Sequence, residues 1–136
     1  RYALVLAPAA HAEGVTIVLP FSDAPTFAAV LAGQSAGWPS SEPLYDAMWL
    51  ACSNGLGWRQ NARRLVLAFG DEHGQGQHGA SEVAWLCASE GVAVSMFGAA
   101  PYRADFEPIC VATGGGWYAL GAVVDLGPVV EGCNVK

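Results

Sequence analysis

Charged residues are scarce in this sequence, and long hydrophobic runs are absent. Only 13% of the 136 residues are charged, 53% are hydrophobic, and the mean hydropathy is +0.32. A chain this apolar is not intrinsically disordered. No apolar run approaches the roughly 20 residues that a membrane-spanning helix needs. The apolar residues therefore fill a core or an interface, and the length fits a single domain.

Basic residues are the scarcer kind of charge. Six Lys and Arg face twelve Asp and Glu, which gives a formal net charge of -6. Arg59, Arg63 and Arg64 lie close together in the chain, but they form no extended basic stripe. Nucleic acid is therefore not an expected partner. The excess of acidic residues is compatible with the binding of divalent cations.

The sequence has no Cys-x-x-Cys pair, so a zinc site is not expected. Its four cysteines are Cys52, Cys87, Cys110 and Cys133. The first three lie in apolar, helix-like segments, which favours buried free thiols. The even count leaves disulfides open if the compartment is oxidising. Since the chain also lacks an initiator Met and a signal peptide, we expect a piece of a longer precursor.

Five stretches have the pattern of strands. Tyr2 to Ala7 and Val15 to Phe21 are separated by a short turn-rich segment, which predicts an antiparallel hairpin at one sheet edge. Leu65 to Phe69 is an unbroken apolar run. Such runs are typical of strands buried on both faces, so we predict a central parallel strand flanked by Val92 to Phe97 and by at least one earlier strand. Trp117 to Leu120 is the last predicted strand.

Helix patterns alternate with these strands. The predicted helices run from a cap at Ser22 or Asp23 to Gly33, from about Leu44 to Ser53, from a cap at Ser81 to Gly91, from Asp105 to Thr113, and from Gly121 to Glu131. This alternation predicts a three-layer α/β sandwich, with a mostly parallel sheet and one antiparallel edge strand.

An acid follows the predicted central strand at once. Ligands of open α/β sheets collect at the carboxyl ends of the strands, so Asp71 lies where a site is expected. His73 and His78 flank the glycine-rich loop that follows. They are candidate ligands for a transition metal, but no regular spacing aligns them. We favour polar residues on a flexible loop.

Several segments together resemble one family. Glu42-Pro-Leu-Tyr-Asp-Ala-Met, Gly57-Trp-Arg, Arg64-Leu-Val-Leu-Ala-Phe-Gly-Asp-Glu-His and Thr113-Gly-Gly-Gly-Trp-Tyr-Ala-Leu occur in this order. They resemble the von Willebrand factor A (VWA) domain, a Rossmann-like fold, and most of all the I-like domain of integrin β subunits. The resemblance covers most of the chain.

The resemblance implies protein binding through a divalent cation, Mg²⁺ or Ca²⁺, at the carboxyl edge of the sheet. Glu42 and Asp71 match the second and third positions of the family's metal site. The first, an Asp-x-Ser-x-Ser loop, is absent, and the nearest echo, Val124 to Gly127, lacks both serines. Two carboxylates alone supply too few oxygens for Mg²⁺. Alternatively, Glu42 is a loop acid beside a helix start, and Asp71 forms an Asx-turn.

The resemblance also implies that the family's first strand is missing, because Tyr2 to Ala7 matches its second strand. Either the sheet is shortened, or another polypeptide fills the space. We favour association with a protein partner, with another segment of the chain's own precursor or with further copies of the chain. The added strand would lie alongside Tyr2 to Leu6 or beside Leu65 to Phe69.

No catalytic set is evident, and the Gly-x-Ser-x-Gly motif of hydrolases is missing. We therefore expect a non-enzymatic protein-interaction or adhesion module, extracellular or at the cell surface, with a degenerate cation site. The alternatives are a structural subunit of an extracellular filament or surface layer without a metal role, and an enzyme of unassigned chemistry.

Overall fold

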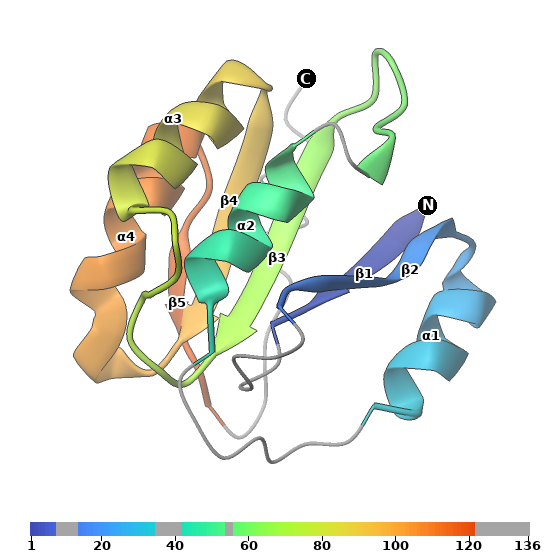
Figure 1. Cartoon of the computed structure of the whole chain (residues 1–136), viewed down its shortest axis with the longest axis horizontal. Coiled ribbons are helices and arrows are strands. Elements are labelled where there is room, and N and C mark those ends of the chain that lie inside the picture. Colours follow the sequence, from blue (N-terminus) through green and yellow to red (C-terminus); the bar gives the residue numbers. More distant parts are fainter. Residues whose placement is uncertain (8–13, 35–41, 54–55, 122–136) are drawn as a thin grey trace.

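The computed structural model describes residues 1–7, 14–34, 42–53 and 56–121 (Figure 1). The predicted last helix falls almost wholly outside these residues, as do Cys133 and the segment from Val124 to Gly127. In chain order, the principal elements are β1 (Tyr2–Leu6), β2 (Thr16–Ser22), α1 (Ala24–Ala32), α2 (Leu44–Cys52), β3 (Arg64–Gly70), α3 (Ala80–Ser89), β4 (Val92–Gly98), the 3₁₀ helix η2 (Ala100–Tyr102), α4 (Arg103–Thr113) and β5 (Trp117–Ala119).

The strands form two sheets. β1 and β2 pair antiparallel, which confirms the predicted hairpin. β3, β4 and β5 form a parallel sheet in that order. Among the described residues, the hairpin forms its own two-stranded sheet and is not an edge of the parallel one. The chain is thus of mixed α/β class.

The predicted central position of β3 is wrong for the described residues. β4 is the middle strand, and β3 pairs with β4 alone. Leu67 and Phe69 of β3 are 37% and 49% exposed, whereas nearly all of β4 is buried. An unbroken apolar run is expected of a central strand and equally of an edge strand whose two faces are both apolar. The sequence pattern could not separate these two cases.

Three helices cover one face of the parallel sheet. α2, α3 and α4 pack side by side, and each contacts a strand beneath it. Their buried residues share one core with Val92, Val94 and Met96, which alternate along β4 and so lie on a single face. α1 packs instead on the hairpin. Two layers are therefore visible in the described part of the chain, and the predicted third layer is not among them.

Caps place most helix ends where the sequence predicts them. Asp23 accepts the Thr26 N–H at 2.9 Å and caps α1, and Gly33 ends that helix. Gly114 ends α4 with a left-handed conformation (φ 76°) that suits glycine. The predicted cap at Ser81 is wrong. The cap position of α3 is Gly79, two residues earlier, and the Glu82 carboxylate accepts the Gly79 N–H at 2.8 Å.

An aromatic row crosses the other face of the parallel sheet. Phe97 of β4 stacks between Phe69 of β3 and Tyr118 of β5, with ring centroids 5.1 and 5.0 Å apart. These residues are register partners in the sheet. Phe97 is only 1% exposed, whereas Phe69 at the β3 end of the row is 49% exposed.

A disulfide joins Cys52 of α2 to Cys87 of α3, and both residues are fully buried. This corrects the expectation of free thiols at these two positions. Helical context alone could not show that the two helices bring the cysteines to a Cα–Cα distance of 5.1 Å, within the range for a disulfide. Cys110 is free and buried as expected, and burial raises the pKa of its thiol. Within the described ranges, no helix is long and apolar enough to cross a membrane.

Candidate functional site: an acidic edge and a basic pocket

The carboxyl end of β3 lies beside the start of α2, and the two elements are in contact at Gly70. A Cβ at this position would lie 2.7 Å from Leu44 Cδ1. Leu44 is the first residue of α2 and is buried in the core. The absence of a side chain at Gly70 therefore lets Glu42, just before α2, reach the same edge as Asp71, just after β3.

Three carboxylates share this edge. The Glu42 N–H donates to Glu72 Oε2 at 3.1 Å. The pKa of Glu42 is raised, mainly by burial and further by the negative charges of Glu72 and Asp71. We call Glu42, Asp71 and Glu72 the acidic edge. The structure thus brings the two sequence-predicted residues together and adds Glu72, which the resemblance did not indicate.

The acidic edge does not amount to a complete metal centre. Across the described residues, no group of three or more His, Cys, Asp and Glu side chains is arranged to hold a metal ion. Mg²⁺ needs about six oxygens in octahedral geometry. Glu72 already accepts a main-chain hydrogen bond. The carboxylates present therefore fit a Mg²⁺ or Ca²⁺ ion only if water or a partner supplies most of its ligands.

The loop that follows Asp71 is held by two further carboxylates. Asp46 of α2 accepts the N–H groups of Gln77 and His78 at 2.9 and 3.0 Å. Asp105 of α4 accepts the Gly74 N–H at 2.9 Å. These bonds connect the loop to α2 and α4. Of the three N–H groups that donate to these carboxylates, only that of Gly74 belongs to a loop glycine, so the glycine run in the sequence signalled this arrangement only in part.

Two of the loop glycines are required by close contacts with α2. A Cβ at Gly74 would lie 2.2 Å from the Tyr45 ring, and one at Gly76 would lie 2.5 Å from Asp46 Oδ1. Tyr45 also donates its N–H to the Gln75 carbonyl and its hydroxyl to the Asp105 carbonyl, at 3.0 and 3.1 Å. The start of α2 therefore fixes the loop as well as the acidic edge.

The two histidines of the loop contact different aromatic residues. His78 stacks on Trp49 with ring centroids 3.9 Å apart, and the His73 ring lies 6.2 Å from that of Tyr102. His78 is thus part of the packing between the loop and α2. In the described part of the chain, neither histidine belongs to a metal-ligand group with Asp71.

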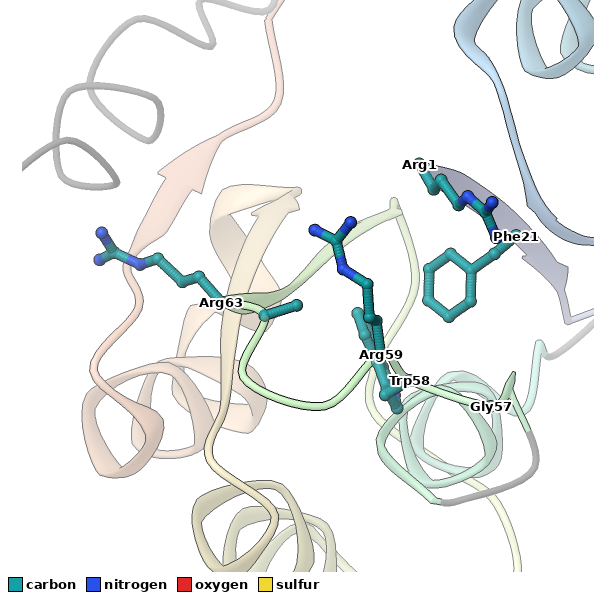
Figure 2. Close-up of a pocket in the computed structure, with 7 residues that line it drawn as sticks. Arg1, Phe21, Gly57, Trp58, Arg59 and Arg63 are labelled. Carbon is teal, nitrogen blue, oxygen red and sulfur yellow. The ribbon is translucent and has the colours of Figure 1, made fainter.

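A pocket of opposite charge lies at the other end of β3. It has a volume of about 120 Å³ and is lined by Arg1, Phe21, Gly57, Trp58, Arg59, Ala62 and Arg63. Phe21 and Trp58 are in ring contact, with centroids 4.8 Å apart. Figure 2 shows the guanidinium groups of Arg1 and Arg59 on either side of the Phe21 ring, whereas the Arg63 side chain points away.

We call this the basic pocket. The sequence showed Arg59 and Arg63 as neighbours, but it contained no sign that Arg1 and Phe21 join them, because that depends on where the hairpin packs.

The chain was also compared with models of protein families, with curated proteins and with solved structures, and none of them matches it.

Proposed function

We propose that this chain is a protein-interaction or adhesion module of the VWA type, and that its acidic edge takes part in binding the partner. The observation that carries the proposal is the gathering of Glu42, Asp71 and Glu72 where parallel strands end. Side chains at this end of an open α/β sheet are the usual contacts to ligands. Several negative charges in one place favour a cationic partner or a bridging divalent cation.

The order of the strands supports the VWA-like part of the proposal. The commonest order in doubly wound sheets is 3-2-1-4-5-6. If β1 to β5 correspond to strands two to six of that order, its neighbours 3-2 and 4-5-6 match both observed sheets. The first strand would lie between β1 and β3. This is the strand whose absence the sequence resemblance implied.

The buried disulfide supports the proposed extracellular or cell-surface location, because disulfides form and persist in oxidising compartments. A weakly bound Mg²⁺ or Ca²⁺ is part of the proposal. With so few protein oxygens at the edge, we expect a dissociation constant of about 10⁻³ M or weaker.

The test compares two variants that each remove one negative charge with little change of shape. Asp71→Asn changes the acidic edge, and Glu107→Gln changes an exposed acid of α4 that pairs with Arg103. Wild type and both variants are immobilised and exposed to an extracellular protein fraction, with Mg²⁺ and Ca²⁺ or with EDTA. Retained proteins are quantified by mass spectrometry.

We expect a set of proteins that wild type and Glu107→Gln retain equally and that Asp71→Asn retains at least threefold less. Loss of the same set in EDTA would support the bridging cation. Retention in EDTA that still depends on Asp71 would rule out the bridging cation but would still support a protein-interaction module. Equal retention on all three proteins would overturn the proposal.

A structural subunit remains the second candidate, and one observation favours it. Leu67 and Phe69 are exposed on β3, which pairs on only one side among the described residues. Exposed apolar edge strands promote assembly. Concentration-dependent polymerisation that EDTA and Asp71→Asn leave unchanged would support this candidate over the interaction module.

A further inference from the structure

Two strands have one edge without a strand partner in the described part of the chain. β3 pairs only with β4, and β1 pairs only with β2. Each therefore presents a row of main-chain N–H and C=O groups on its other side. Such edges are templates for the addition of another strand.

The two edges belong to one body, because both strands pack on α2 and share its core. α2 contacts β1 and β3. Ala7, which follows β1, is only 8% exposed and lies in the same hydrophobic cluster as Leu44 and Met48 of α2. Both edges therefore lie beside the same helix.

β1 and β3 also run in the same direction. Their amino ends meet at the basic pocket, where Arg1 precedes β1 and Arg63 precedes β3. Their carboxyl ends meet at the start of α2, since Leu44 lies against Gly70 and shares a cluster with Ala7. Figure 1 shows both strands pointing toward the same side of the molecule. A strand placed between them can be parallel to both.

The side chains of β3 specify the apolar character of that strand. Val66 and Ala68 pack into the helix-covered core. Leu67 and Phe69 are exposed on the opposite face, at the open end of the aromatic row. On one face, a neighbouring strand would pack on the helix-covered core, and on the other its side chains would lie beside the apolar Leu67 and Phe69. Strands in that situation have unbroken apolar sequences.

The charges at the two ends of β3 specify the direction in which the added strand would run. The amino end has the basic pocket with Arg1 and Arg59, and the carboxyl end has the acidic edge with Glu42 and Asp71. An acidic residue before the apolar run would pair with a guanidinium group, as carboxylates do in charge-assisted hydrogen bonds. The same acid at the other end would face like charges.

We infer that the domain binds an extended segment of another protein, an acidic residue followed by five to seven apolar residues, as a parallel strand between β1 and β3. The length follows from the five residues of β1 and the seven of β3. This inference rests on the proposed function in that the ligand is a protein. It does not depend on Asp71 or on a cation.

The test begins with selection from a displayed library of random nine-residue peptides on the folded chain. The enriched peptides should have an acidic residue followed by an apolar run. The best peptide is then synthesised in two forms, with N-methyl groups on its odd or on its even apolar residues. Successive residues of a strand direct their amides to opposite neighbours. Because the peptide pairs with β1 and with β3, each form should bind at least tenfold more weakly.

Loss in only one of the two forms would show pairing with a single edge and overturn insertion between the strands. Failure to enrich such peptides, or association of the chain with itself that the peptides do not displace, would also overturn the inference.

A charge exchange tests the polarity. Arg59→Glu should weaken the selected peptide about tenfold, and a peptide with Lys in place of its acid should restore binding to that variant. Arg103→Glu makes the same change on α4, away from the pocket, and should have no effect. If the peptide bound the Arg59→Glu variant as tightly as wild type, the result would contradict the assigned direction of the bound strand.

The two proposals fail separately. Peptide binding in EDTA by the Asp71→Asn variant, together with loss of Asp71-dependent protein retention, would leave this inference and remove the proposed role of the acidic edge. Asp71-dependent retention without any peptide binding would do the reverse.

Discussion

The molecule has two parts that differ in how much of their surface is buried. The larger unit consists of the parallel sheet with α2, α3 and α4, and β4 at its centre is almost entirely buried. The hairpin unit consists of β1, β2 and α1, and none of the nine residues of α1 is buried. Since burial of apolar surface is the main source of stability, the larger unit can hold its own structure. The hairpin unit has little burial of its own and depends more on its contact with α2.

The largest expected effect compares one phenylalanine from each unit. Phe106 of α4 is fully buried, whereas Phe27 of α1 is half-buried and touches the Tyr2 ring. Phe106→Ala should lower the free energy of unfolding by about 3–5 kcal/mol, because it leaves a cavity in the core. Phe27→Ala should cost less than half of that. Chemical denaturation of the two variants gives the comparison, and equal losses would show that the two units do not differ in this way.

The disulfide should rank second. It closes a loop between positions 35 residues apart and lies wholly within the larger unit. The Cys52→Ala, Cys87→Ala double variant should lose about 2–5 kcal/mol of unfolding free energy. Hydrogen exchange in β1 and β2 should change no more than this global loss explains. Cys110→Ala, which removes a buried free thiol, is the matched control. If the control lost as much as the double variant, the loss would come from packing and not from the crosslink.

A smaller effect should be confined to the hairpin unit. Asp23→Ala removes the side-chain cap of α1 and should lower the local stability of that helix. Hydrogen exchange should quicken in α1 while the larger unit keeps its protection. Asp23→Asn retains an acceptor for the Thr26 N–H and should behave like wild type. Faster exchange in α3 or α4 would show that the two units unfold together.

The smallest effect concerns pH and the acidic edge of the larger unit. The pKa of Glu42 is raised in the folded state, first by burial and then by its negative neighbours. The folded state therefore holds this proton more tightly than the unfolded state does. The stability that the proton contributes is present below the unfolded pKa and is lost as the pH rises through the folded pKa. Glu42→Gln should reduce the fall in the free energy of unfolding at pH values just above the ordinary pKa of 4.5. At neutral pH the variant should be no less stable than wild type. A steeper fall in the variant would contradict the assigned burial of Glu42.

Local features of the sequence predicted most of the elements. The apolar spacing of Leu44, Met48 and either Ala51 or Cys52 predicts the buried face of α2, and all four residues are buried. The predicted end of α1 at Gly33 and the glycine turn at Gly114 are also confirmed. These features depend on residues within a few positions of one another. Local patterns in the sequence are therefore enough to predict them.

The candidate site was predictable only in part. Asp71 follows from its place after an apolar strand, and Glu42 from the family resemblance. Asp46, Asp105 and Glu72 carried no signal of their own. Their hydrogen bonds join positions about 30 residues apart, so their role depends on how α2, the loop and α4 pack.

The sequence by itself determined the alternation of helices and strands, the antiparallel hairpin and the scarcity of positive charge. The tertiary structure decided that β4, and not β3, is the middle strand of the parallel sheet among the described residues, because both strands have similar apolar patterns. It also decided that Cys52 pairs with Cys87, because α2 lies against α3. The meeting of Arg1, Phe21 and Arg59 in one pocket was likewise decided by packing. These outcomes depend on the relative positions of elements far apart in the chain, and local patterns of residues do not encode those positions.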